Sequence, residues 1–286
     1  MNIYAKLISE QLRLPETGVE NTIALLDLGC TIPFIARYRK ERTGNLDEVQ
    51  ISQINNIYEK LQEIAKRKET ILKTITDQGK MTPELQKRID ETWDATVLED
   101  IYLPFKPKRR TRAQVAREQG LEPLATTILF QRERDIMNVA RRYVKGDVKD
   151  IDMALKGAQD IIAETISENE DSRNRLRRAF ERQAVITSKV VKGKESLEES
   201  QKYADYFDWS ESLRRCSSHR LLAMRRGEAE GVLRVSISPD QDECISNLQR
   251  QYVRGSGECS RLVEEAVEDC YKRLLKPSIE IGRAHV

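Results

Sequence analysis

The sequence predicts a mostly α-helical fold: an elongated array of helices with one long spine helix and at most a small β element near residues 232–238. Charged residues make up 34% of the 286 residues, against about 25% in an average globular protein, and aromatic residues only 6%. Apolar residues recur three and four apart through most of the chain, as in solvated helices around an aliphatic core. The length allows one large or two ordinary domains.

The first helices are indicated by apolar spacing and by residues that end helices. We expect one helix from Ile3 to Leu14 and a second that begins at Pro15–Glu16 and closes at Gly29. A third should run from about Pro33 to Arg42.

The spine helix should follow Gly44. Asn45 can cap it while Glu48 reaches back three residues, and the helix can continue to Gly79. At 1.5 Å per residue it would approach about 50 Å in length. Its predicted apolar stripe comprises Ile54, Ile57, Tyr58, Leu61, Ile64, Ala65, Ile71, Leu72 and Ile75.

The rest of the chain also favours helices. Thr82 and Pro83 are typical of a helix start, and that helix should reach about Trp93. The segment 188–200 has few apolar residues and is expected to be an exposed loop, and 232–238 is the one convincing strand. Further helices are expected at 112–119, 122–131, 135–143, 151–167, 171–183 and 261–276.

The overall charge does not identify a partner. Forty-nine basic and 47 acidic residues leave a net charge of +2, so any nucleic-acid signal must be local. Five scattered cysteines without a Cys-x-x-Cys pair indicate reduced thiols, and neither a metal site nor a cofactor is expected. The chain has neither a run of about 18 apolar residues nor a secretory leader, so we expect a cytoplasmic protein without a membrane segment.

Six basic residues gather between Pro104 and Arg117, where two prolines prevent a continuous helix. An extended, donor-rich segment suits a phosphate backbone, because each guanidinium can hold phosphate oxygens bidentately. The alternative is a solvated loop that pairs with acidic residues such as Glu99 and Asp100, and charge alone favours neither. The six are Lys106, Lys108, Arg109, Arg110, Arg112 and Arg117.

A second basic set lies on the helix expected at 171–183. Arg175, Arg178 and Arg182 are three and four residues apart and should share one face. That stripe could lie along a phosphate backbone or dock onto an acidic helix, and both alternatives stay open.

A third basic cluster, Arg37, Arg39, Lys40 and Arg42, is better explained by local structure. Basic residues in a last helical turn complement the helix dipole, and their stems can cover apolar surface.

No catalytic arrangement is predicted. Ser218, His219 and Glu228 fall in one string, but a nucleophile and a base adjacent on a helix point in different directions. A structural role is more economical: Ser217 or Ser218 caps a helix that Gly227 ends.

Three long strings, in this order, resemble one family, the bacterial transcription accessory proteins called Tex. They are IPFIARYRKERTGNLDE at 32–48, LEDIYLPFKPKRRTRAQVAREQGLEPLA at 98–125 and SHRLLAMRRGEAEGVL at 218–233. One departure is Cys216–Ser217, where the family pattern has a proline before the Ser-His pair.

The resemblance implies an amino-terminal helical region with a helix-turn-helix-like module. In the family it is followed by an RNase H-like domain, helix-hairpin-helix motifs and an OB-fold RNA-binding domain, so we expect this chain to be an amino-terminal fragment without them. The expected parts are 1–125, 126–280 and a non-native tail, 281–286, which matches what a sequencing adapter encodes. Without downstream helices, the apolar residues Val263, Val267, Leu274 and Leu275 should be exposed.

The sequence and the resemblance together predict a non-enzymatic helical scaffold of an RNA-binding transcription accessory protein. Its expected partner is the RNA or DNA backbone, and no small-molecule substrate is expected. The alternative is a docking module for RNA polymerase, the ribosome or the rest of the parent chain, with no direct nucleic-acid contact.

Overall fold

The computed structural model describes residues 2–107 and 110–283, with side chains described up to residue 279. Contacts divide the chain into two compact units, Met1–Lys106 and Pro107–Val286. The boundary between these units lies earlier in the chain than the domain boundary expected at residue 125. The expected domain organisation stays a prediction. The predicted mostly α-helical fold with a small β element is confirmed.

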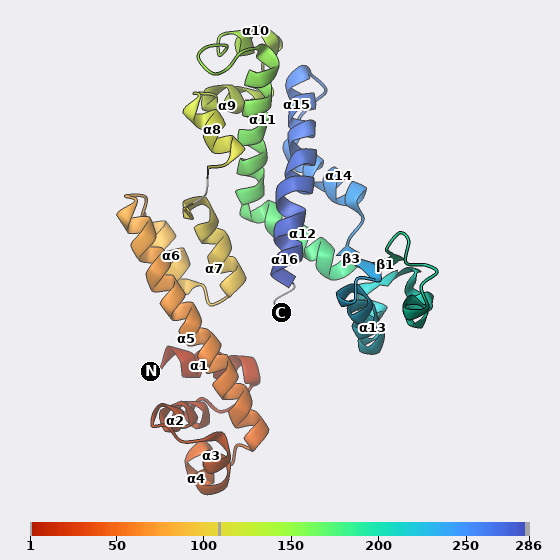
Figure 1. The fold of residues 1–286 in the computed structure, drawn as a ribbon. Coiled ribbons are helices and arrows are strands. Elements are labelled where there is room, and N and C mark those ends of the chain that lie inside the picture. Colours follow the sequence, from red (N-terminus) through yellow and green to blue (C-terminus); the bar gives the residue numbers. More distant parts are fainter. Residues whose placement is uncertain (1, 108–109, 284–286) are drawn as a thin grey trace. The chain divides into compact units, whose positions relative to one another are not determined.

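The first unit is built along the long helix α5, Glu48–Asp77 (Figure 1). Its 30 residues correspond to about 45 Å, close to the predicted length. The buried side chains of α5 include Ile54 and Tyr58 in its first half and Ile71 and Ile75 in its second half. The other elements of the unit are α1 (Ile3–Leu12), α2 (Glu16–Asp27), α3 (Ile32–Tyr38), α4 (Lys40–Thr43), α6 (Pro83–Glu91), α7 (Ala95–Tyr102) and the 3-10 turn η1 (Leu103–Phe105).

The start of α5 differs from the prediction. Asn45 does not cap it, because this residue has a left-handed backbone (φ 63°), whereas an N-cap needs an extended one. Asp47 caps the helix instead: its carboxylate accepts from the Gln50 backbone N–H, and the Gln50 side chain accepts from the Asp47 backbone N–H. The predicted third helix is also broken in two, at Arg39.

The second unit is organised around α11, Ile151–Glu168. In Figure 1, α8 and α9 lie along one side of α11 and α15 along the other, in agreement with their contacts. The helices of this unit are α8 (Arg112–Glu118), α9 (Glu122–Phe130), α10 (Ile136–Arg141), α11, α12 (Glu170–Gln183), α13 (Ser218–Ala229), α14 (Gln241–Tyr252), α15 (Glu258–Asp269) and α16 (Lys276–Arg283), with the 3-10 segments η2 (Glu198–Tyr206) and η3 (Leu213–Arg215) and the π-helical turn η4 (Cys270–Leu275).

A glycine allows α8 and α9 to approach α11 closely. A Cβ atom at Gly157 would lie 2.5 Å from Leu121 Cδ1 and 3.3 Å from Ala116 Cβ. Both neighbours are buried, so neither can move aside freely.

An antiparallel sheet with strand order β2-β1-β3 follows α12. The strands are β1 (Val185–Val190), β2 (Asp208–Ser212) and β3 (Leu233–Ser238). Only β3 was predicted, and the loop expected at 188–200 is wrong at both ends: Ser188 is a buried strand residue and Ser200 is buried in η2. β1 was missed because a buried serine interrupts its apolar alternation.

Two expectations for the end of the chain are wrong. Gly227 does not end α13 but lies within it, where an added Cβ would meet Leu233 Cδ1 at 2.6 Å. Val263, Val267 and Leu275 are fully buried, because this apolar face packs into the core around α11. None of the helices among the described residues has the length and apolar character needed to cross a membrane.

Replacing Gly157 with Val should destabilise the second unit by about 1–3 kcal/mol, because the added atoms overlap buried side chains. The neighbouring exposed change Lys156→Ala should alter stability by less than about 0.5 kcal/mol. Urea unfolding followed by circular dichroism measures both, and equal stability of the two variants would contradict the close approach.

Candidate nucleic-acid interface

The basic run between Lys106 and Arg117 is divided between a turn and a helix. Lys106 follows η1 and is exposed, and Lys108 and Arg109 lie outside the described residues. Thr111 caps α8, so Arg112 and Arg117 are helical, as expected for residues 112–119, and the extended segment can include only the basic residues before Thr111.

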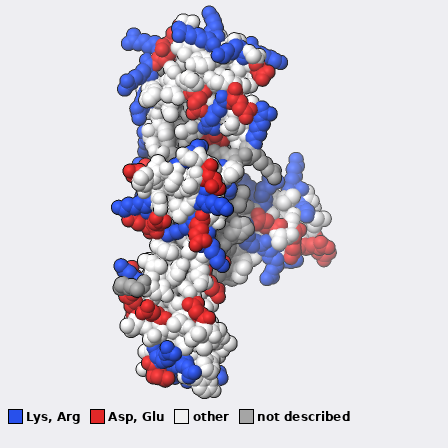
Figure 2. Space-filling view, turned by 90° about the vertical axis from the view of Figure 1, so that its left-hand side faces the viewer, with Lys and Arg blue, Asp and Glu red and all other residues white. Residues whose placement is uncertain are grey.

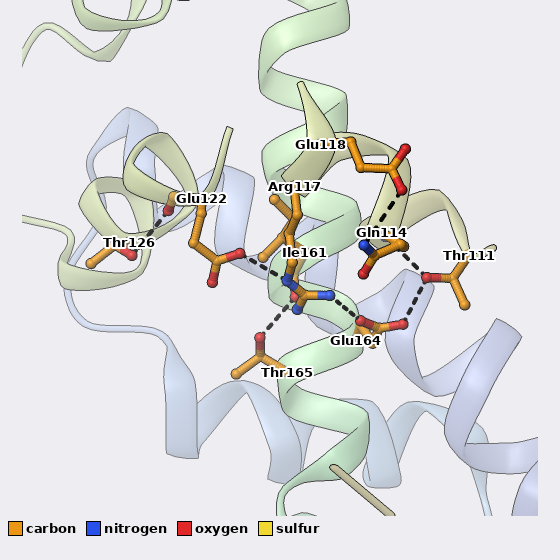
Figure 3. Close-up of polar contacts among 9 residues, drawn as sticks. All are labelled: Thr111, Gln114, Arg117, Glu118, Glu122, Thr126, Ile161, Glu164 and Thr165. Atoms are coloured by element: carbon orange, nitrogen blue, oxygen red, sulfur yellow. Dashed lines mark hydrogen bonds and ion pairs between the residues drawn. The ribbon is translucent and has the colours of Figure 1, made fainter. Parts of the chain in front are cut away.

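Arg117 is held by two carboxylates (Figure 3). Its guanidinium donates through Nη1 to Glu164 Oε2 of α11 and through Nε to Glu122 Oε2 of α9, the latter over 2.8 Å. The Thr111 hydroxyl donates to the other oxygen of Glu164 over 3.0 Å. The Glu164 side chain is only 10% exposed, so this cluster ties α8 and the start of α9 to α11.

Electrostatics keep this cluster charged. Burial alone would lower the pKa of Arg117, but the hydrogen bond and negative charge of Glu164, helped by Glu122, raise it above its ordinary value. The guanidinium therefore stays protonated and its donors are directed at protein carboxylates. This arrangement favours a packing role for Arg117 over a phosphate contact.

The other described members of the run are more accessible. Arg110 pairs with Glu118 over 2.9 Å, and both side chains are well exposed, so the pair is weak and can exchange partners. Arg112 is exposed, and its positive charge helps to lower the pKa of Asp269, after the larger effect of the Arg273 hydrogen bond.

The arginines of α12 divide into two sets by their contacts. Arg173 donates to the Ser167 carbonyl and the Ser278 hydroxyl, and Arg177 donates to the Asn174 side chain. The predicted set, Arg175, Arg178 and Arg182, is exposed and shares one side of α12, as its spacing predicts. In the described part of the chain, no hydrogen bond or ion pair involves these three guanidinium groups.

A groove of about 490 Å³ runs between α12 and α14 beside two of these arginines. Arg175 and Arg178 line it from α12, and Arg250 lines it from α14. The floor is apolar and includes Leu176 and Leu248. Three guanidinium groups around one groove give it a strongly positive rim, which attracts anions.

Two further residues of α14 contribute polar groups to this groove. Asn247 lines it, and the buried Gln251 Oε1 has no hydrogen-bond partner among the described residues. Arg250, Asn247 and Gln251 were not predicted as site residues, because the helix that carries them, α14, was itself not predicted from the sequence. Only the packing of α14 against α12 brings them to the predicted arginines.

One face of the molecule carries charges of both signs. Figure 2 shows one face of the molecule, on which basic and acidic side chains are intermixed.

The serine, histidine and glutamate of the 218–233 string do not form one hydrogen-bonded triad in the described structure. Ser217 Oγ lies 3.3 Å from His219 Nε2, while Glu228 pairs with Arg225 on the same helix. Within residues 2–107 and 110–283, no group of three or more His, Cys, Asp or Glu side chains is placed to hold a metal ion. All five cysteines are free thiols.

Comparison with known proteins gives two family matches. Residues 2–76 match the Tex-like protein N-terminal domain, and residues 131–281 match the Tex central region-like family. Similar proteins include the transcriptional accessory protein Tex of Neisseria gonorrhoeae, 41% identical over 252 residues, which are 88% of this chain and 33% of that protein. Protein tex of Bordetella pertussis is 44% identical over 84% of this chain and 30% of its own length.

A more distant relative is the human S1 RNA-binding domain-containing protein 1, which is 30% identical over 95% of this chain and 28% of its own length. The chain thus spans about a third of the length of the curated relatives it matches.

Replacing Arg117 with Ala should lower the free energy of unfolding by about 2–4 kcal/mol, because it leaves the buried Glu164 carboxylate without its charged partner. The matched change Arg110→Ala, in an exposed pair, should cost at most about 1 kcal/mol. Urea denaturation compares them, and a loss no larger for Arg117→Ala than for Arg110→Ala would refute the packing role.

The thiols should differ in reactivity. Cys244, Cys259 and Cys270 are buried, and burial raises the pKa of each, so they should resist alkylation until the protein unfolds. Cys30 is partly exposed and should be modified in the native state. Mass spectrometry after iodoacetamide treatment, with and without urea, locates the modified residues. Rapid native labelling of Cys270 would show that its region opens.

Proposed function

This chain belongs to the Tex family, and we propose that it is a non-catalytic helical scaffold of a transcription accessory protein that binds the phosphate backbone of nucleic acid, RNA in the first place. The main contact is the exposed arginine face of α12 together with the groove between α12 and α14. We also propose a cytoplasmic location, which the sequence predicts and which agrees with a transcription accessory role.

The observation that carries this proposal is the unpaired state of Arg175, Arg178 and Arg182 in the described structure. An arginine engaged by a carboxylate must lose that partner before it can hold a phosphate, whereas an unpaired one has only water to displace. Arg175, Arg178 and Arg182 span two turns of α12 and thus about 10 Å, which suits successive phosphates of a backbone.

The basic run before and within α8 has a secondary part in this proposal. Lys106, Lys108, Arg109, Arg110 and Arg112 remain candidate backbone contacts. Arg117 is assigned to packing, because Glu122 and Glu164 occupy its donors.

The names of the relatives support a function related to transcription and RNA. One is called a transcriptional accessory protein and another is named for an S1 RNA-binding domain. This chain covers about a third of the length of those relatives. A transcription accessory activity of the longer parent protein, and contacts of that protein with RNA polymerase or the ribosome, are therefore also proposals.

The test is binding of the 286-residue chain to labelled single-stranded RNA, single-stranded DNA and duplex DNA over a salt series. The log-log slope of affinity against salt should be several units. Changing Arg175, Arg178 and Arg182 together to Ala should reduce it by about 2–3 units, since each lost phosphate contact removes about 0.7–0.9 unit.

A charge-matched control separates local contact from net charge. Arg141, Arg142 and Lys145 are exposed in the same unit, and their joint replacement with Ala removes the same three charges. The control should keep most of the slope. Equal losses in both triple variants would reduce the interface to diffuse charge, and no binding at low salt would favour the alternative, a docking module for a protein partner.

A further inference from the structure

Two aromatic side chains of the first unit are exposed beside a cluster of basic residues. Tyr38 is 61% exposed and Phe34 37% exposed, although Tyr4, Tyr58 and Trp93 of the same unit pack edge to face. The Phe34 and Tyr38 ring centroids are 5.4 Å apart, and the rings are tilted by 45°. Two neighbouring exposed rings are unusual on a surface with so few aromatic residues.

The helix geometry of α3 explains this exposure. Phe34 and Tyr38 are four residues apart and therefore share a face, whereas Ile35 and Ala36 are turned into the core of the unit. The two side chains are outside that core and are exposed to solvent.

The surrounding charge is strongly positive. Residues 37–42 contain one acidic residue, Glu41, and four basic ones, Arg37, Arg39, Lys40 and Arg42. The Arg39 guanidinium lies over the Phe34 ring, 5.0 Å from its centroid, and donates to the Tyr38 carbonyl. Arg37, Lys40 and Arg42 are exposed, and none has an ion-pair partner among the residues that the structure describes.

Tertiary contacts fix this corner in place. Gly18 of α2 admits the Thr43 carbonyl so closely that an added Cβ would lie 2.6 Å from its oxygen. The Asn21 side chain donates to the Arg42 carbonyl over 2.8 Å, and Gly44 closes α4 with a left-handed backbone (φ 73°). The backbone that carries the rings and cations is thus held in place by tertiary contacts, which reduces the conformational entropy lost on binding.

We propose that Phe34, Tyr38 and the basic residues around them form a second binding site, for single-stranded nucleic acid, in which bases stack on the rings and phosphates contact Arg37, Lys40 and Arg42. Exposed bases have π faces that stack on aromatic rings in any sequence, and the backbone between them matches the unpaired cations. A duplex keeps its bases stacked on each other and cannot use the rings. This inference rests on the proposed function for the class of ligand but uses the other unit of the chain.

The sequence suggested that this basic cluster complements the helix dipole and covers apolar surface with its side-chain stems. That explanation accounts for Arg39, whose guanidinium covers the Phe34 ring. It leaves the 61% exposure of Tyr38 without a role. A stacking surface explains both, because a cation beside a ring strengthens its hold on a base and its phosphate.

The test compares Tyr38→Ala with Tyr38→Phe in the 286-residue chain. The probes are a labelled 20-nucleotide uridine RNA and a 20-base-pair DNA duplex. Tyr38→Ala should weaken RNA binding by about 5- to 150-fold, the range for one stacked base, and leave duplex binding within about twofold. Tyr38→Phe keeps the ring and should restore RNA binding. The salt slope should be the same in both variants, because no phosphate contact is lost.

Phe130→Ala is the matched control, since Phe130 is 60% exposed and lies in the other unit. It should leave RNA binding unchanged, and circular dichroism should show that all variants are folded. Unchanged RNA affinity in Tyr38→Ala, or an equal loss for RNA and duplex, overturns the stacking site.

The outcomes also separate this inference from the proposed function. If the triple Ala variant at Arg175, Arg178 and Arg182 loses affinity while Tyr38→Ala does not, the α12 interface stands and the stacking site fails. If Tyr38→Ala alone loses RNA affinity, the stacking site stands and the α12 interface fails.

Discussion

The second unit depends on one constraint: α11 is buried along most of its length and carries polar groups that only its neighbours can satisfy. The Glu164 carboxylate accepts hydrogen bonds from Arg117 of α8 and from Thr111, which caps α8. Asp160 accepts from Arg273 of the π-helical turn, and Gln159 donates to the Leu262 carbonyl and to Glu265 of α15. α8, α15 and the π-helical turn thus each have a hydrogen-bonding position that fixes their place along α11, in addition to apolar contact that alone would permit sliding.

This constraint also sorts the basic residues into structural and available ones. Arginines whose donors meet buried carboxylates, such as Arg117 and Arg273, hold helices together. Arginines on the outer face of α12 have no such partner in the described structure, and charge in the sequence does not distinguish the two kinds. The density of basic residues alone therefore does not show which arginines are free of protein partners. The helical spacing of Arg175, Arg178 and Arg182 does predict that these three share an exposed side of α12.

Much of the fold could be predicted because helix signals are local. Thr82 caps α6 as its sequence indicates, and the apolar spacing of α11 matches its buried side. The cap of α5 was misplaced because Asn45 is a suitable residue type held in an unsuitable backbone conformation. β1 and β2 could not be predicted because Val185 pairs with Ser212 and Ser238, both distant in sequence. Likewise, only tertiary packing brings Arg250 beside Arg178.

The π-helical turn at Cys270–Leu275 has a consequence for changes in chain length. Such a turn holds more residues than an α-helical one, and each residue of an α-helix advances the direction of its side chain by about 100°. Deleting one residue here would let α15 and α16 join as a regular α-helix with α16 close to its present orientation, because the wide turn spreads one extra residue over the same rotation, and Ile279 would still face the core. A deletion within the regular part of α15 would instead turn α16 by about 100°, so the π-helical turn is the place in these joined helices where the chain can lose a residue without rotating α16.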